Sequence, residues 1–322
     1  MLWLGLILII AGIALLWVAA DPFVDAAARL AHIWGVSPVL VGALVIGFGT
    51  SAPELVVSGL AAARGELASS VGNVVGSNAA NLTLVLGASV VICPVVGQLR
   101  IIRREGVITI LAMIAVVLVA WDDYLHRVEG ILLVAGMAVA SVFLVRWSRH
   151  DVRDGLAGAT LDEDDDSASG DHRPSRELAK AFASLVGIVG GAALLVEGGG
   201  TVADHYGLAG GFVGATIFAL GTSLPELVTA GAAARRGANE LVIGNLLGSN
   251  LFNSLLVVGI AGVVGAGAIG ERRVGEHVMM LLIGLLVGVM AITRLRLGRT
   301  QGVVLLVAFV VFIGVVAQNA TA

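Results

Sequence analysis

The sequence of 322 residues is short of charge: only 13% of its residues are Asp, Glu, Lys or Arg, whereas soluble globular domains have about 25%. In contrast, 58% of the residues are hydrophobic. A soluble core of this size could not bury so much apolar surface, so lipid must surround most of the chain. The net charge of -4 argues against nucleic acid as a partner.

Cysteine and catalytic motifs are also scarce. The single cysteine, Cys93, allows neither an internal disulfide nor a cysteine zinc site. The apolar segments contain no G-x-S-x-G, no H-E-x-x-H and no paired His/Cys set, and the sequence has no phosphate-binding P-loop. We therefore expect neither an enzyme nor an ATP-driven pump, and we expect no bound cofactor.

The chain has instead a series of apolar segments that are long enough to cross a bilayer. The first has no positively charged flank and is too long for the apolar part of a signal peptide, so we interpret it as a membrane span. Only helices and closed barrels cross lipid, and barrel strands would be ~10 residues long with strict alternation. The sequence therefore predicts an all-α integral membrane protein with ten transmembrane helices. The ten segments lie at about 2–20, 37–63, 69–93, 106–121, 128–146, 178–197, 208–234, 240–268, 276–293 and 302–318.

The distribution of basic residues predicts the orientation in the membrane. With the N-terminus outside, 15 of the 19 Lys and Arg residues lie in cytoplasmic loops and 4 lie outside. Because cytoplasmic loops carry an excess of Lys and Arg, we expect both termini outside the plasma (inner) membrane and the loop 147–177 in the cytoplasm.

The stretch 147–177 is charged, rich in small residues and without an apolar period, which is typical of a flexible linker. Its acidic run from Asp162 to Asp166 could suggest a calcium-sensing loop. An EF-hand loop needs Gly at its sixth position and Glu at its twelfth, and here Ser167 and Arg173 occupy them. We therefore favour a solvated run of charges.

An internal repeat is the most informative feature of the sequence. The stretch GTSAPELVVSGLAAARG begins at Gly49, and GTSLPELVTAGAAARRG begins at Gly221, 172 positions later (221 − 49). At the same offset, GNVVGSNAANLTLVLG from Gly72 matches GNLLGSNLFNSLLVVG from Gly244. From Gly49 to Gly87, 21 of 39 positions are identical, where chance would give a few.

The repeat divides the chain into two halves, residues 1–146 and 178–322, on either side of the linker. Each half has five expected spans. An odd number of spans inserts the second half upside down relative to the first. Such inverted repeats around a site at the middle of the membrane are the architecture of secondary transporters.

The second expected span contains a predicted break. Pro53 has no backbone N–H and disfavours helix at the residue before it, so we expect the helix to break at about Gly49 to Ala52 and to restart at Pro53. The break frees backbone carbonyls such as that of Thr50, which can coordinate a cation. The seventh span repeats the pattern with Gly221, Thr222, Ser223, Pro225 and Glu226.

Glu54 and Glu226 follow these breaks. An ionised residue in the middle of a span costs at least about 2.5–3.5 kcal/mol, and two carboxylates among neutral oxygens suit calcium, which takes 6–8 oxygen ligands. The alternative is helix capping, because Ser51 and Ser223 each begin an S-x-x-E capping box. Two such motifs at symmetric positions inside membrane spans favour ion binding, although capping and binding are compatible.

The third and eighth spans carry further polar residues at a spacing of four, which places each set on one helix face. Hydrogen bonding between helices is the alternative to ion binding. It is an equal alternative for Asn73 and Asn245, and packing or capping is favoured for Asn78 and Asn250, which point off this face. The four residues that we favour as ligands are Ser77, Asn81, Ser249 and Asn253.

These motifs resemble those of the sodium/calcium exchanger family, within the cation/calcium antiporter superfamily, in its prokaryotic ten-span form. GTS-x-PE followed by G-N-x-x-G-S-N-x-x-N, present twice, is similar to the alpha-repeat signature of that family. The resemblance implies that Glu54 and Glu226 bind calcium and share the sodium sites. It further implies backbone carbonyl ligands at Thr50, Thr222 and Ala219, the last for sodium, and side-chain oxygen ligands at Ser51, Ser77, Asn81, Ser223 and Ser249.

One departure from the family pattern concerns charge. Many relatives have Asp where this chain has Asn253, and both repeats carry Asn here, at Asn81 and Asn253. This lowers the charge of the site and leaves the ion stoichiometry open. The proton/calcium branch typically has G-N-x-x-E in place of GTS-x-PE, which favours sodium coupling.

We therefore expect an antiporter that exchanges calcium for sodium by alternating access and that functions as a monomer in the lipid bilayer. The alternative within transport is a calcium antiporter coupled to protons or potassium. A passive cation channel is a further alternative, but channels usually obtain their pore from several subunits, whereas two halves of one chain can make a closed site.

Overall fold

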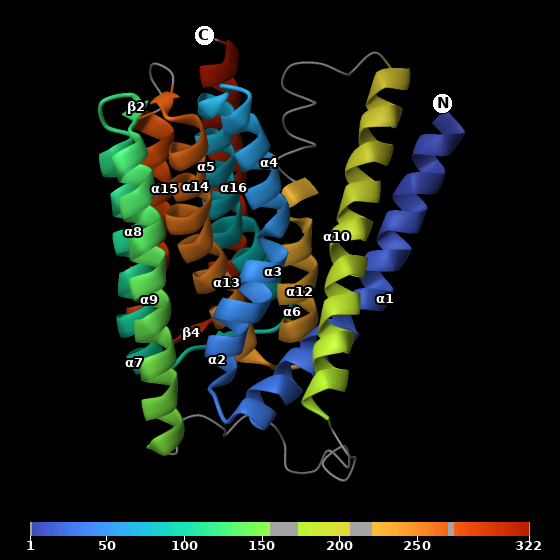
Figure 1. Ribbon diagram of the computed structural model, residues 1–322. Coiled ribbons are helices and arrows are strands. Elements are labelled where there is room, and N and C mark those ends of the chain that lie inside the picture. Colours follow the sequence, from blue (N-terminus) through green and yellow to red (C-terminus); the bar gives the residue numbers. More distant parts are fainter. Residues whose placement is uncertain (1, 155–172, 207–220, 270–273, 322) are drawn as a thin grey trace.

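Long apolar helices run side by side through most of the molecule, with two short strand pairs near its ends (Figure 1). The computed structural model describes residues 2–154, 173–206, 221–269 and 274–321. In Figure 1 the two termini lie at one end of the bundle, whereas the end of α9 and the start of α10 lie at the other. An even number of membrane crossings agrees with this arrangement.

The first half contains five runs of helix, in which η marks a π-helical turn. Its elements are α1 (Leu2–Trp34), α2 (Pro38–Val41), η1 (Gly42–Gly47), α3 (Phe48–Thr50), α4 (Ala52–Ala63), α5 (Leu67–Ala80), η2 (Asn81–Val85), α6 (Leu86–Ile92), β1 (Val95–Val96), α7 (Leu99–Ile101), η3 (Ile102–Gly106), α8 (Val107–Val119), β2 (Tyr124–Leu125) and α9 (Arg127–Arg153).

The second half repeats this order in its described residues. Its elements are α10 (Pro174–His205), α12 (Leu224–Arg235), α13 (Asn239–Phe252), η5 (Asn253–Val257), α14 (Val258–Gly265), β3 (Gly267–Ala268), α15 (Val274–Arg294), β4 (Arg296–Leu297) and α16 (Arg299–Thr321).

The apolar helices confirm the predicted all-α membrane architecture. Seven described helices are long and apolar enough to cross a bilayer, and the bent pair Pro38–Thr50 and Ala52–Ala63 brings the number to eight. Two expected spans are not matched in full. One corresponds to α8, which has 13 residues and is continued at its start by η3. The other, 208–234, begins outside the described residues, so the count of ten stays a prediction.

Helix α1 extends well past the end of the first apolar segment. It passes Pro22 and ends at Trp34, where the sequence suggested a loop. The extension has an apolar face, with Phe23, Ala27 and Leu30 buried. Burial of this face compensates for the backbone hydrogen bond that a proline removes from a helix interior.

The prediction of a flexible linker over 147–177 is wrong at both ends of that stretch. Helix α9 continues to Arg153, and α10 begins at Pro174. Ion pairs hold these helix ends: Asp151 pairs with Arg104, and Glu177 pairs with Lys180 at 2.8 Å. The central part, which includes the acidic run from Asp162 to Asp166, lies outside the described residues.

The predicted break in the second span is confirmed. Helix α3 ends at Thr50, Ser51 stands between the helices, and α4 restarts at Ala52 with a bend of 46°. Pro53 occupies the first turn of α4, where a missing N–H is tolerated. The restart therefore comes one residue earlier than the sequence suggested.

The strand pairs reveal the inverted relation of the two halves. Strand β1 pairs with β4, and β2 pairs with β3. Replacing each residue of the pair Val95–Leu297 by its repeat equivalent gives Gly267–Leu125 (95 + 172 and 297 − 172), which is the register of the other ladder. Figure 1 shows β2 near one end of the bundle and β4 near the other. Equivalent segments thus lie at opposite ends, as inverted repeats require.

Close backbone packing brings the two halves together at the centre. A Cβ atom on Gly244 of α13 would lie only 3.0 Å from the Cα of Gly42 in η1, and a Cβ on Gly248 would collide with the backbone of Ala43. Only glycine permits so close an approach. The contact sets η1 of the first half directly against α13 of the second.

Candidate ion-binding site

The two glutamates lie at equivalent positions, in the first turns of α4 and α12. Both side chains are completely buried, and they lie close enough to repel each other electrostatically. Each sits at the N-terminus of a helix of 12 residues. The partial positive charge of a helix N-terminus favours a nearby carboxylate, so each helix start offsets part of the cost of burying an ionised glutamate.

Serine hydroxyls connect the glutamates to both halves. Ser51 of the first half donates to Glu226 Oε1 of the second at 3.1 Å, and Ser77 donates to Glu54 Oε1 at 3.2 Å. Ser223 Oγ donates to Ser77 Oγ at 3.4 Å. These bonds join five of the predicted ligands in two buried groups, Ser51 with Glu226 and Ser223 with Ser77 and Glu54.

The alternative of a capping box is wrong for both motifs. Ser51 and Ser223 occupy the N-cap positions of α4 and α12, but neither side chain makes a capping hydrogen bond. Ser51 is directed instead to the carboxylate of the opposite half. In both motifs the serine hydroxyl therefore bonds across the two halves and not to its own helix end.

One oxygen of each carboxylate is left available. Glu54 Oε2 and Glu226 Oε2 are buried and have no hydrogen-bond partner among the described residues. A buried charged oxygen without a partner is costly. Two such oxygens from opposite halves are suited to a bound cation, which would satisfy both.

A second group of oxygens lies around Thr50. Its hydroxyl is 3.4 Å from Ser249 Oγ and donates to Asn245 Oδ1 at 3.4 Å. Ser249 in turn donates to the backbone carbonyl of Gly47 at 3.3 Å. Of the two asparagines for which the alternatives were equal, Asn245 thus faces the site, whereas Asn73 donates to Ser58 at 3.1 Å between α5 and α4.

Sequence reasoning missed Gly47 as a candidate carbonyl ligand. It stands at the repeat position of Ala219 (47 + 172), which the family resemblance did indicate, so the repeat offset could have identified it. Ala219 itself lies outside the described residues. Thr222 and Ser223 are described and buried, with the Thr222 hydroxyl directed to Glu54.

Asn81 and Asn253 are the most exceptional polar side chains of the group. Both are completely buried, and neither the amide oxygen nor the amide nitrogen of either residue has a hydrogen-bond partner among the described residues. Each begins a π-helical turn, η2 and η5. Such turns are rare and often mark functional sites, and nothing in the local sequence predicted them.

The neighbouring asparagines donate hydrogen bonds that connect helices or cap a helical carbonyl. Asn78 donates to Ser254 at 2.9 Å across the two halves, and Asn250 donates to the carbonyl of Leu246 at 2.9 Å within α13. In the described part of the chain, no group of three or more His, Cys, Asp or Glu is arranged to hold a metal ion. The candidate site therefore offers two carboxylates together with hydroxyl, amide and carbonyl oxygens, a donor set that would suit a hard cation.

Inverted halves with a buried oxygen site at their junction define a membrane antiporter for cations. The family model of the sodium/calcium exchanger protein matches residues 4–146 and 178–318. The chain therefore belongs to the sodium/calcium exchanger family, whose members are transporters.

Individual relatives agree over nearly the whole length. The inner membrane protein YrbG of Escherichia coli (strain K12) is 30% identical over 308 residues, which cover 95% of this chain and 94% of that protein. The sodium/calcium exchanger MaX1 of Methanosarcina acetivorans is 28% identical and covers 97% of this chain and 98% of its own length. A solved structure of the sodium-calcium exchanger NCX_Mj superposes with a TM-score of 0.83 at 26% identity, covering 98% of this chain and 99% of that chain.

Proposed function

We propose that the protein exchanges calcium for sodium across the membrane by alternating access at a site formed by Glu54 and Glu226. The observation that carries the proposal is the pair of buried carboxylates from opposite halves, each with one oxygen that lacks a hydrogen-bond partner in the described residues. Two negative charges are neutralised by one calcium ion or by two sodium ions. Neutral occupancy should cross the membrane most easily, because residual charge at membrane depth is costly.

The proposed ligands extend beyond the carboxylates. The hydroxyl and amide oxygens of both halves surround them, and the carbonyl of Gly47 joins this set through its contact with Ser249. The full set comprises Thr50, Thr222, Ser51, Ser223, Ser77, Ser249, Asn81, Asn253 and Ala219, besides the two glutamates. Two relatives support the choice of ions, since MaX1 and NCX_Mj are both named as exchangers of sodium and calcium.

The decisive experiment is calcium flux in proteoliposomes under separate sodium, potassium and proton gradients. We expect saturable calcium uptake that requires sodium on the opposite side. Uptake driven by a proton or potassium gradient and indifferent to sodium would support the alternative coupling. Flux that needs no counter-ion would support a channel. Glu54→Gln protein, incorporated to the same level, provides the control for leakage.

The proposed location is the inner membrane, with both termini outside and 147–177 in the cytoplasm. The excess of basic residues in one set of loops supports it, as does the name of the E. coli relative. A cysteine at position 165, in a variant whose native Cys93 is replaced by serine, tests the orientation. We expect no labelling of intact cells by an impermeant thiol reagent, and ready labelling after the cells are opened. Since one chain supplies both carboxylates, a monomer is sufficient.

A further inference from the structure

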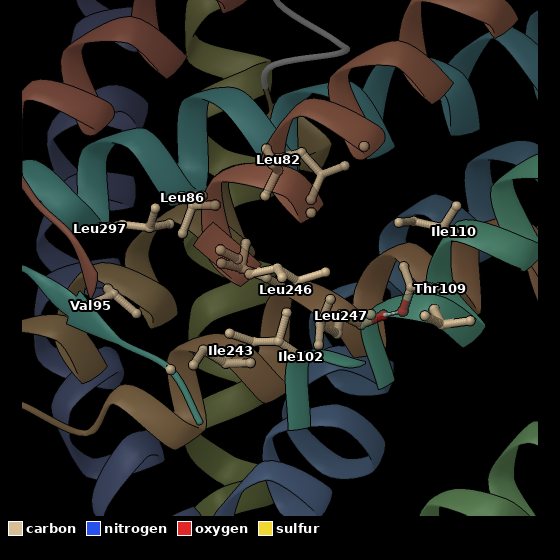
Figure 2. Close-up of a pocket in the computed structure, with 18 of the residues that line it drawn as sticks. Leu82, Leu86, Val95, Ile102, Thr109, Ile110, Ile243, Leu246, Leu247 and Leu297 are labelled. Atoms are coloured by element: carbon tan, nitrogen blue, oxygen red, sulfur yellow. Dashed lines mark hydrogen bonds between the residues drawn. The ribbon is translucent and has the colours of Figure 1, made fainter. Parts of the chain in front are cut away.

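A cavity of about 110 Å³ lies beside the strand pair β1–β4. Its wall is formed by residues of α6, η2, α8, α13 and α15. Figure 2 shows labelled side chains from the first four of these segments around a common space. None of the proposed ion ligands lines it. The cavity therefore has no assigned role in ion binding.

The wall of the cavity is almost entirely hydrocarbon. Its polar side chain, Thr109, already donates to the carbonyl of Glu105 at 2.9 Å and lies 3.4 Å from the carbonyl of Leu247. A water needs ~10–15 Å³ and two to four polar partners. This space is several times larger than one water needs and offers almost no partners, so its occupant should be apolar.

The cavity borders on the lipid. Val107 of α8 and Ile292 of α15 line it and are also exposed on the surface of the bundle, as is Leu295.

Leu295 has φ 50°, a left-handed conformation that is unfavourable for leucine. The repeat-equivalent residue, Asp123 (295 − 172), has φ 58°, and aspartate tolerates this conformation better. A leucine in this unfavourable conformation is explained if its side chain is needed to close the cavity.

Three arginines are sequence neighbours of residues that line the cavity. Arg103 follows the lining residue Ile102, and Arg294 and Arg296 flank the lining residue Leu295. All three are exposed, and none has an ion-pair partner in the part of the chain that the structure describes. By contrast, Arg104 of the same turn pairs with Asp151. An apolar space beside unpaired cations at the membrane surface matches a molecule with a hydrocarbon chain and an anionic head.

We propose that the cavity binds one anionic phospholipid of the leaflet on the β1–β4 side, with an acyl chain between α8 and α15 and the phosphate against Arg103, Arg294 and Arg296. Glycines at positions 106, 284 and 288 keep the space open. The proposal requires only that the chain lies in a membrane, so it stands or falls independently of the ions transported.

Native mass spectrometry of the detergent-solubilised protein, titrated with phosphatidylglycerol or phosphatidylcholine, tests the proposal. We expect one phosphatidylglycerol to be retained in preference to phosphatidylcholine. Two variants fill the cavity from different helices, Gly288→Leu on α15 and Ile243→Phe on α13. Gly288 suits this purpose because a Cβ there would meet only the end of the Ile110 side chain, at 3.3 Å. Either variant that retains the wild-type melting temperature should lose the bound lipid.

The head-group contact is tested by a matched pair of double variants. Arg103→Gln with Arg294→Gln should weaken phosphatidylglycerol binding about 25-fold, or about fivefold for each charge near the membrane surface. Arg64→Gln with Arg127→Gln, at exposed arginines of the other end, should change it less than twofold. Undiminished lipid in the folded cavity-filling variants, or equal losses in the two double variants, would overturn the proposal.

Discussion

Around Glu54 and around Glu226 the two halves of the molecule place the same residue types at the same positions, whereas one residue beyond Asn81 and Asn253 they diverge. Leu82 lines an apolar cavity, but its repeat equivalent Ser254 accepts a hydrogen bond from Asn78. If the proposed ligands bind ions that arrive from either side of the membrane, both halves must provide similar oxygen atoms, which explains why these positions are alike in the two repeats. Residues that contact only lipid or other apolar side chains need not be alike in the two halves.

The largest effect expected from this comparison concerns the carboxylates. Glu54→Gln and Glu226→Gln should each reduce calcium transport on the order of 100-fold or more, because a divalent ion facing one carboxylate would leave buried charge uncompensated. Calcium flux in proteoliposomes measures the loss, and thermal unfolding in detergent checks that both variants fold. Near wild-type transport by either variant would contradict the proposed site.

Charge at the π-helical turns gives the next prediction. A third sodium ion would leave one positive charge on neutral oxygens, and Asn253 cannot offset it. We expect Asn253→Asp to favour a third sodium ion and to make calcium flux depend more steeply on an imposed membrane potential. Asn81→Asp is the matched variant of the other half. A reversal potential that already indicates three sodium ions per calcium in the wild type would defeat this charge argument while leaving sodium coupling intact.

The serines should produce an intermediate effect that differs between the halves. Ser51 donates directly to Glu226, whereas Ser223 donates to Ser77. Hydrogen bonds to charged groups contribute about 1.5–3 kcal/mol, so Ser51→Ala should lower the apparent calcium affinity about tenfold or more. Ser223→Ala should lower it about threefold, which corresponds to a neutral hydrogen bond. Calcium dependence of initial flux separates the two, and equal losses would mean that the hydroxyls act as equivalent ligands.

The smallest effect is expected at the first asparagine of each motif. Asn73 is partly buried and bonds to Ser58, away from the carboxylates, whereas Asn245 contacts Thr50 inside the site. Asn73→Ala should therefore change calcium affinity by less than about twofold, and Asn245→Ala should lower it by several fold, since a net hydrogen bond is worth about 0.5–1.5 kcal/mol. A larger loss for Asn73→Ala than for Asn245→Ala would reverse the assignment.

The internal repeat allowed much of the architecture to be predicted, because local rules govern the relevant features. The absence of an N–H in Pro53 predicts the helix break at Ser51. The cost of a charge in mid-span indicates a function for the glutamates, and the length of the apolar segments predicts membrane spans. Identical motifs at a constant offset then predicted that Glu54 and Glu226 would meet.

Other features could not be predicted because they depend on tertiary contacts. The π-helical turns at Asn81 and Asn253 have no sequence signature. The helical continuation of α9 depends on Arg104, which reaches Asp151 only once α7 to α9 have folded. Likewise, the direction of Ser51 toward Glu226 could not be separated from capping, since the same S-x-x-E pattern serves both. The cavity beside Leu295 arises from the packing of several segments.

The exchanged pairing of the short strands also constrains how the protein is made. Val96 pairs with Arg296, 200 positions further along the chain (296 − 96). At synthesis rates of about 5–20 residues per second, β1 waits roughly 10–40 s at the membrane surface before its partner leaves the ribosome. During that interval β1 lacks the strand with which it forms its backbone hydrogen bonds, because β4 has not yet been synthesised. Biogenesis of this protein is therefore completed only when the last helices enter the bilayer.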